Sequence, residues 1–178
     1  KIPPEKISFA LNQRLPEDIR IQKSEEVSTD FHPRYCNSKK TYEYKILNRR
    51  FPNPMVRLYT HFVYMPLDVE LMKEAAGYIV GEHDFASFCS AGSQVKTTVR
   101  TIYELDINKE NDIIAIKISG NGFLYNMVRI IVGTLMKVGL KVYPPEHVKE
   151  IIEAKDRYMA GPKAPAKGLT LVGIEYQE

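Results

Sequence analysis

Alternation of hydrophobic and polar residues along the chain predicts several β-strands. In residues 41–47, Tyr42 and Tyr44 fall on one face and Glu43 and Lys45 on the other, which is the period-two pattern of a half-buried strand. Further strands are predicted at residues 18–23, 58–64, 99–107, 113–119 and 169–176. The polar turn NKEND lies between the third and fourth of these stretches, so we expect those two to form a hairpin.

Other stretches have the spacing or the end signals of helices. The best-marked helix covers residues 69–80, because Asp68 stands where an N-cap is expected and Gly81 follows the end. Residues 123–140 are apolar and long enough for a buried helix. Two more helices, each opening on a proline pair, are predicted within residues 3–13 and 144–157.

The order of these elements predicts the fold class. From residue 58 onward the chain runs strand, helix, strand, strand, helix, extra helix, strand. This is the split β-α-β, ferredoxin-like order, so we expect an α+β fold with a mixed or antiparallel sheet and helices on one face. Residues 31–178 are expected to form this α+β domain and residues 1–30 to be a connection leading into it.

Composition narrows the class of protein. The chain has 178 residues, of which 44% are hydrophobic and 26% charged, so it is neither fibrous nor disordered. No run approaches the ~18 apolar residues that span a bilayer, and no membrane partner is expected. Cys36 and Cys89 fit no metal-binding or redox spacing, which favours a reducing, cytoplasmic setting and predicts no metal site.

The net charge of +3 conceals two basic segments. Residues 31–50 hold six basic residues against one acidic residue, with four aromatic residues interleaved, a mixture that suits phosphate contacts beside base stacking. Residues 155–167 hold four basic residues against one acidic residue. Either segment alone is as well explained by a solvated surface, but together they favour RNA or DNA as a partner, and the split β-α-β order favours RNA. The candidate RNA contacts are Arg34, Lys39, Lys40, Lys96, Arg100, Lys163 and Lys167.

Arg129 is the only charged residue between Ser119 and Met136, inside the apolar stretch predicted as a buried helix. A guanidinium held against such a helix keeps its proton and needs a partner, typically a carboxylate. Two interpretations stay open at this point. Arg129 either extends to water along a polar edge of the helix, or it positions and keeps ionised a carboxylate in an active site. No carboxylate in the chain is an obvious partner by its sequence context.

Four motifs together carry a family resemblance. They are FHPRYCNSKKTYEYKILN, GEHDFASF, GNGFLYNMVRIIVGTLMKVG and AKDRYMAGPKAPAKGLTLVGIEY. In this order they closely resemble the C-terminal two-thirds of the bacterial tRNA pseudouridine synthase A family. The resemblance covers nearly the whole chain and implies a pseudouridine synthase fold. It also implies an enzyme without metal or organic cofactor that isomerises uridines at positions 38–40, in the anticodon stem-loop of tRNA, and works as a homodimer.

One motif of that family is missing. The Arg-Thr-Asp motif, which supplies the nucleophilic aspartate, occurs nowhere in these 178 residues. The chain is therefore expected to be a fragment that begins near the end of the N-terminal half, with residues 1–30 as that end. Alone it is expected to be inactive.

The resemblance also implies roles for individual residues. Arg129 in MVRI would pair with the aspartate, Tyr42 in TYEY would stack on the target uracil and relay a proton, and Leu169 in KGLTL would close the apolar side of the pocket. Arg34 would clamp a phosphate, although Pro33 replaces the family's usual alanine. Taken without the resemblance, Tyr42 is better explained as a core or sheet-face tyrosine and Leu169 as ordinary core.

Two other functions remain as alternatives at this point. One is a non-catalytic RNA-binding module, and the other is a dimerisation domain of a small-molecule enzyme, for which neither basic segment has a use. In GEHDFASF, Asp84, Phe85 and Phe88 are expected to cap and pack a short helix and not to take part in catalysis.

Overall fold

The computed structural model describes residues 2–176. The chain divides between Cys36 and Asn37 into two compact units. The division lies six residues after the predicted one between residues 30 and 31.

The first unit contains one short helix. A single 3₁₀ turn, Pro4–Lys6, leads into α1, Ile7–Asn12, as predicted for residues 3–13. The strand predicted at residues 18–23 is wrong, because this stretch pairs with no other strand. Its backbone is held instead by the Asn12 side chain, which donates to the Ile21 carbonyl and accepts from the Ile21 N–H, both at 2.8 Å.

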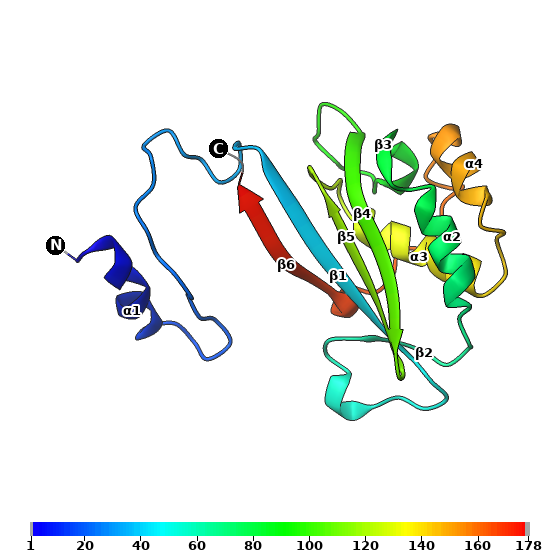
Figure 1. Cartoon of the computed structure of the whole chain (residues 1–178), viewed down its shortest axis with the longest axis horizontal. Helices are drawn as coiled ribbons and strands as arrows, with labels where there is room; N and C mark the ends of the chain where they lie inside the picture. Colours follow the sequence, from blue (N-terminus) through cyan, green and yellow to red (C-terminus); the bar gives the residue numbers. More distant parts are fainter. Residues whose placement is uncertain (1, 177–178) are drawn as a thin grey trace. The chain divides into compact units, whose positions relative to one another are not determined.

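The second unit is built on a six-stranded sheet (Figure 1). The strands are β1 (Ser38–Asn48), β2 (His61–Val63), β3 (Gly81–Asp84), β4 (Val99–Glu110), β5 (Ile113–Gly120) and β6 (Leu169–Tyr176). Across the sheet, β1 lies between β6 and β5, β4 follows β5, and β3 follows β4. These neighbours are all antiparallel. Only the short β2 runs parallel to a neighbour, and it pairs with the last three residues of β1, Ile46–Asn48.

The ferredoxin-like order is present, but its first strand differs from the predicted one. Residues 58–64 contribute only the three-residue β2, whereas β1 is the first strand of the split β-α-β unit and β4, β5 and β6 are the others. The hairpin between β4 and β5 is confirmed and is longer than predicted, because pairing continues to Glu110 and Ile113. Its turn is made by Asn111 and Asp112, with Asn111 in the left-handed conformation at φ 52°.

Three helices pack on one face of this sheet (Figure 1). They are α2 (Val69–Gly77), α3 (Met127–Gly139) and α4 (His147–Ala154), each shorter than its predicted range. As predicted, Asp68 caps α2, accepting from the Leu71 N–H at 3.3 Å. That hydrogen bond, followed by the Lys141 side chain, lowers the pKa of Asp68. Gly81 opens β3, with φ 113°, a strand that the sequence pattern did not reveal.

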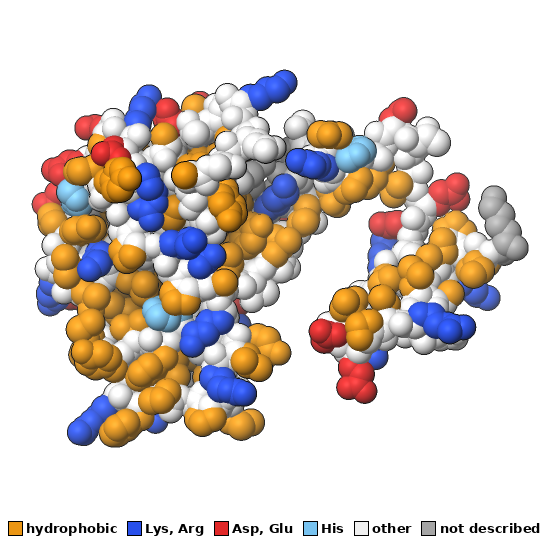
Figure 2. All heavy atoms as spheres, turned by 180° about the vertical axis from the view of Figure 1, so that it is seen from behind, with side chains coloured by type: hydrophobic (Ala, Val, Ile, Leu, Met, Phe, Trp, Pro, Cys, Tyr) orange, Lys and Arg blue, Asp and Glu red, His pale blue; other side chains and the backbone are white. Residues whose placement is uncertain are grey.

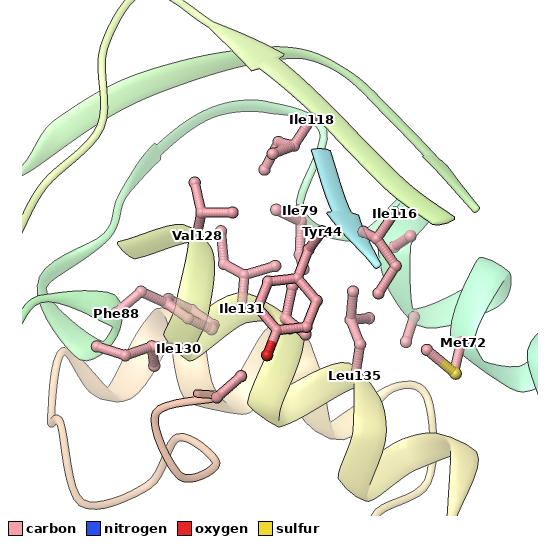
Figure 3. Packing of buried hydrophobic residues seen from close by; sticks show 14 of the residues in the cluster. Tyr44, Met72, Ile79, Phe88, Ile116, Ile118, Val128, Ile130, Ile131 and Leu135 are labelled. Carbon is pink, nitrogen blue, oxygen red and sulfur yellow. The ribbon is translucent and has the colours of Figure 1, made fainter. Parts of the chain in front are cut away.

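The core lies between the sheet and the helices. From the sheet, alternate residues of β1 and β5 point inward, among them Tyr44, Ile116 and Ile118, all with no exposed surface. They meet Ile131 and Leu135 of α3, as Figure 3 shows from close by. Within the described residues, no helix is both long and apolar enough to cross a membrane.

Candidate active site

A cavity of about 360 Å³ lies at the junction of β1, α3 and β6. It is lined by Tyr42, Phe123, Leu124, Asn126, Met127, Val128, Arg129, Ala166 and Leu169. Its size falls in the range of pockets that hold small ligands. Three residues that the sequence singled out for catalysis or substrate binding, Tyr42, Arg129 and Leu169, therefore line one cavity, although 127 positions separate the first from the last.

The aromatic side of the cavity comes from a strand and a loop. Tyr42 points to the helix-covered face of β1, and its ring meets the ring of Phe123 edge to face, with the centroids 5.1 Å apart. Leu169 enters from the start of β6, where it pairs in register with Tyr44. Gly168, just before it, must be a glycine because an added Cβ would lie 2.7 Å from the Tyr44 ring.

The segment before α3 is shaped by Asn126. The predicted helix 123–140 begins only at Met127, because Asn126 adopts the left-handed conformation, with φ 61° and ψ 11°. Asparagine is one of the few residues besides glycine that adopts this conformation readily. The chain turns sharply there, so Phe123 and Leu124 line the cavity instead of continuing the helix.

Arg129 lies in the first turn of α3 and is half-buried. Its Nε donates to the Ala164 carbonyl at 2.7 Å, and its Nη1 donates to Asn126 Oδ1 at 3.1 Å. Among the described residues no carboxylate pairs with it, and its Nη2 has no hydrogen-bond partner. Arg129 thus places a positive charge at the wall of the cavity, and the N–H groups of its Nη2 remain available to donate hydrogen bonds.

Residues 160–168, here called the wall loop, contribute Ala166 to the lining of the cavity and contact α3. The Ala164 N–H donates to the Arg129 carbonyl at 3.0 Å, which completes a two-way link with the guanidinium contact described above. The Tyr44 hydroxyl donates to the Pro165 carbonyl at 2.7 Å. Gly133 of α3 allows this close approach, because a Cβ there would lie 1.6 Å from the Pro162 carbonyl oxygen.

The candidate RNA contacts are spread over both units. Arg34 lies in the first unit and is exposed, with its backbone N–H bonded to His32 Nδ1 at 3.2 Å. Lys163 and Lys167 are exposed on the wall loop. The pKa of His61 is lowered, first by burial and then by the positive charge of Lys167.

Lys39 and Lys40 differ in placement. Successive residues of a strand point to opposite faces, so Lys40 shares the face of Tyr42 whereas Lys39 lies on the other. Lys39 also approaches Glu175, with Nζ and Oε1 3.9 Å apart. Arg100 and Lys40 lie near the same end of the sheet, because β4 and β1 both pair there with the end of β5. The Arg100 side chain donates to the backbone carbonyls of Thr97 and Val99. Lys96 is exposed in the loop before β4.

The uncovered face of the sheet carries a larger groove, of about 660 Å³. Both cations that line it are paired: Lys45 with Glu43 at 2.9 Å, and Arg49 with Asp112 at 3.1 Å. Three of the six basic residues in the segment 31–50 are therefore in ion pairs, counting Lys39. The groove offers no unpaired cation of the kind that Arg129 provides.

Asp84 has the structural role that the sequence favoured. It accepts from the Ala86 N–H at 3.2 Å and from the Thr98 hydroxyl at 2.5 Å, and it pairs with Lys155 at 3.1 Å. These contacts lower its pKa, with the Thr98 hydrogen bond as the main cause. Among residues 2–176 no cluster of His, Cys, Asp and Glu side chains could hold a metal ion. Both cysteines are free.

Sequence reasoning missed several residues of this site. Asn126, Ala164 and Tyr44 hold Arg129 or the wall loop, and Phe123 faces Tyr42. The only sequence signal for Asn126 was an asparagine inside a stretch expected to be helical. A backbone acceptor such as the Ala164 carbonyl leaves no signal in the sequence.

Comparison with known proteins gives one consistent result. A family model described as tRNA pseudouridine synthase matches residues 75–177. The tRNA pseudouridine synthase A of Thermoanaerobacter sp. (strain X514) is 49% identical over 176 residues, which cover 99% of this chain and 72% of the relative. That of Acetivibrio thermocellus is 49% identical over 175 residues, 98% of this chain and 72% of the relative. The tRNA pseudouridine synthase A 2 of Clostridium tetani is 51% identical over 175 residues, 98% of this chain and 71% of the relative.

Proposed function

The chain belongs to the tRNA pseudouridine synthase family, and we propose from this premise that the cavity beside Arg129 receives the uridine. The activity is the isomerisation of uridine to pseudouridine in tRNA. In this reaction the bond between the ribose C1′ and the uracil N1 breaks, the uracil rotates, and a bond forms between C1′ and C5. The proton on C5 is lost and N1 gains one, so no oxidant or reductant is consumed.

The observation that carries the proposal is the unpaired side of Arg129. A half-buried cation at the wall of a cavity, which no carboxylate of the described residues neutralises, is suited to hold a catalytic carboxylate in its ionised form. We assign that carboxylate to the Arg-Thr-Asp motif of the family, which these 178 residues do not contain. Arg129 Nη2 is the donor available to it.

The rest of the cavity suits a base removed from the stack. Tyr42 offers an aromatic surface to the uracil, and the Phe123 ring packs against the Tyr42 ring at an angle of 88°. Leu169 provides an apolar contact across the cavity. The Tyr42 hydroxyl is the group that we propose relays a proton during the rearrangement.

We further propose that the enzyme binds the anticodon stem-loop of tRNA and modifies positions 38–40, as the resemblance implies. Exposed Lys163 and Lys167 on the wall loop, and Lys40 on the cavity side of β1, are suited to the phosphates around the flipped nucleotide. Figure 2 shows Lys and Arg side chains interspersed with hydrophobic ones on one side of the second unit, which begins at Asn37. Arg34, Lys96 and Arg100 are the other proposed contacts, and Lys39, which lies on the opposite face of β1 beside Glu175, is proposed as a weaker one. A tRNA substrate and two free cysteines suit a cytoplasmic enzyme.

A homodimer is proposed on the same premise. Between β1 and α2 the chain exposes Phe51, Met55, Leu58 and Tyr59, with Met55 at 86% of its surface. Large apolar side chains gathered on one exposed segment are typical of an interaction surface. Sedimentation velocity that finds only monomers at micromolar concentration would overturn this part of the proposal.

Replacement of Arg129 tests the proposed function. In the complete gene product, Arg129→Ala should abolish pseudouridine formation, measured as tritium release from tRNA labelled at uridine C5, while tRNA affinity stays within about twofold. Lys137→Ala, at the other end of the same helix, is the matched control and should keep full activity. Full activity of Arg129→Ala would refute the role of the arginine.

A further inference from the structure

The guanidinium of Arg129 is fixed by two contacts on two different segments. The Ala164 carbonyl of the wall loop accepts from Nε, and the side chain of Asn126 accepts from Nη1. An arginine has five N–H donors and rotates freely about its stem unless such contacts hold it. Both acceptors are neutral, so they orient the group without neutralising its charge.

Asn126 is itself oriented by a third segment. Its Nδ2 donates to Ser90 Oγ at 3.0 Å, and the Ser90 N–H donates to the Tyr125 carbonyl at 3.0 Å. Because the amide nitrogen is engaged by Ser90, the amide oxygen faces Arg129. Asn126 lines the cavity next to Arg129, three residues away along the chain.

From this arrangement we infer that Asn126 is a positioning residue, which aims Arg129 Nη2 at the catalytic carboxylate. The inference rests on the proposed function of Arg129. Two properties of asparagine serve this role together: it tolerates the left-handed backbone that starts α3 at Met127, and it supplies a neutral acceptor. Aspartate would keep the backbone but would place a second negative charge beside Arg129.

Two substitutions separate the amide from the backbone conformation. Asn126→Gly keeps the left-handed conformation at no steric cost and removes the acceptor. We expect kcat to fall by roughly tenfold to a hundredfold, because misplacing a catalytic group by about 1 Å costs rates of this order, while the KM for tRNA changes little. The matched control is Asn111→Gly in the β4–β5 turn, where the asparagine has φ 52° and lies outside the cavity. It should keep wild-type kcat.

Asn126→Asp distinguishes positioning from a merely structural role. A structural acceptor would be replaced well by a carboxylate, so that variant would be at least as stable and as active as Asn126→Gly. In our proposal the new charge pairs with Arg129 and repels the catalytic carboxylate, which raises the pKa of the latter. Asn126→Asp should therefore be less active than Asn126→Gly at neutral pH, and the acid limb of its kcat/KM profile should move to higher pH.

Thermal unfolding and a second variant complete the test. The thermal unfolding midpoints of Asn126→Gly and Asn111→Gly should agree within a few degrees. If Asn126→Gly does not fold, Ser90→Ala is the second variant. It removes the hydrogen bond that holds the Asn126 amide, so it should lower kcat several-fold. Wild-type kcat in whichever of these two variants folds, or an Asn126→Asp enzyme more active than the glycine variant, would overturn the inference. If Arg129→Ala is inactive and Asn126→Gly is not impaired, only this inference fails. An active Arg129→Ala would overturn the proposed function and with it this inference.

Discussion

Tyr44 shows how one buried side chain can fix the geometry of the neighbouring cavity. It has no exposed surface, yet its hydroxyl reaches across to the Pro165 carbonyl of the wall loop, and burial raises its pKa. Tyr44→Phe should lower the free energy of unfolding by about 1 kcal/mol, the net contribution of one hydrogen bond. It should also lower kcat several-fold, because the loop that holds Arg129 loses one anchor.

The control for this change is Tyr103→Phe, because Tyr103 of β4 is 47% exposed. Tyr44→Phe should have a lower free energy of unfolding than Tyr103→Phe in urea denaturation, and a lower kcat in the tritium-release assay. Equal stability and equal activity of Tyr44→Phe and Tyr103→Phe would mean that the hydrogen bond to Pro165 positions nothing.

The residues that sequence could identify at this site are those whose chemical type is unusual for their surroundings. A lone cation in an apolar stretch drew attention to Arg129, and the alternating pattern placed Tyr42 and Tyr44 on one face, which the structure confirms. Asn126 and Ala164 act through a backbone conformation and a backbone carbonyl. Those properties are set by tertiary packing, so residue type alone does not predict them.

At the scale of elements, β1 divides the two lysines that the sequence treated as one basic pair. Lys40 lies on the cavity side of the sheet and Lys39 on the other, where Glu175 approaches it. Lys40→Glu should therefore weaken binding of an anticodon stem-loop RNA by about tenfold and flatten its salt dependence, since a lost phosphate contact lowers the salt slope by about one.

Lys39→Glu is the matched control for Lys40→Glu, because it makes the same charge change one residue away. It should alter RNA affinity less than threefold in fluorescence anisotropy titrations at several salt concentrations. Equal weakening by both substitutions would show that RNA responds to the net charge of the strand and not to one of its faces.

Local pattern predicted most of these elements, and non-local contacts decided the rest. The apolar run of α3 was clear in the sequence, but its start depended on the conformation of Asn126. Strand β3 is four residues long, GEHD, and has no hydrophobic alternation, so only its pairing with β4 makes it a strand. Residues 18–23 alternate well but lack a neighbouring strand, which shows that alternation without a partner does not form a sheet.

At the scale of the molecule, the ferredoxin-like class followed from the order of elements, whereas the identity of the first strand did not. Both residues 41–47 and 58–64 were predicted as strands, and the order alone could not say which of them enters the centre of the sheet. The structure places β1 between β5 and β6, and β2 beside its end. The choice matters for function because β1 carries Tyr42 into the cavity.

The 178 residues themselves can be used to test whether they bind RNA without forming pseudouridine. They contain the aromatic face, the cation and the basic surface that we propose for the site, but no Arg-Thr-Asp motif. A preparation of these residues that circular dichroism shows to be folded should bind the anticodon stem-loop with an affinity that falls steeply as salt rises, because phosphate contacts release counterions. It should release no tritium from tRNA labelled at uridine C5, whereas the complete gene product should. Tritium release by the 178 residues alone would mean that the carboxylate beside Arg129 comes from within this chain, and would require another acidic residue to approach the cavity.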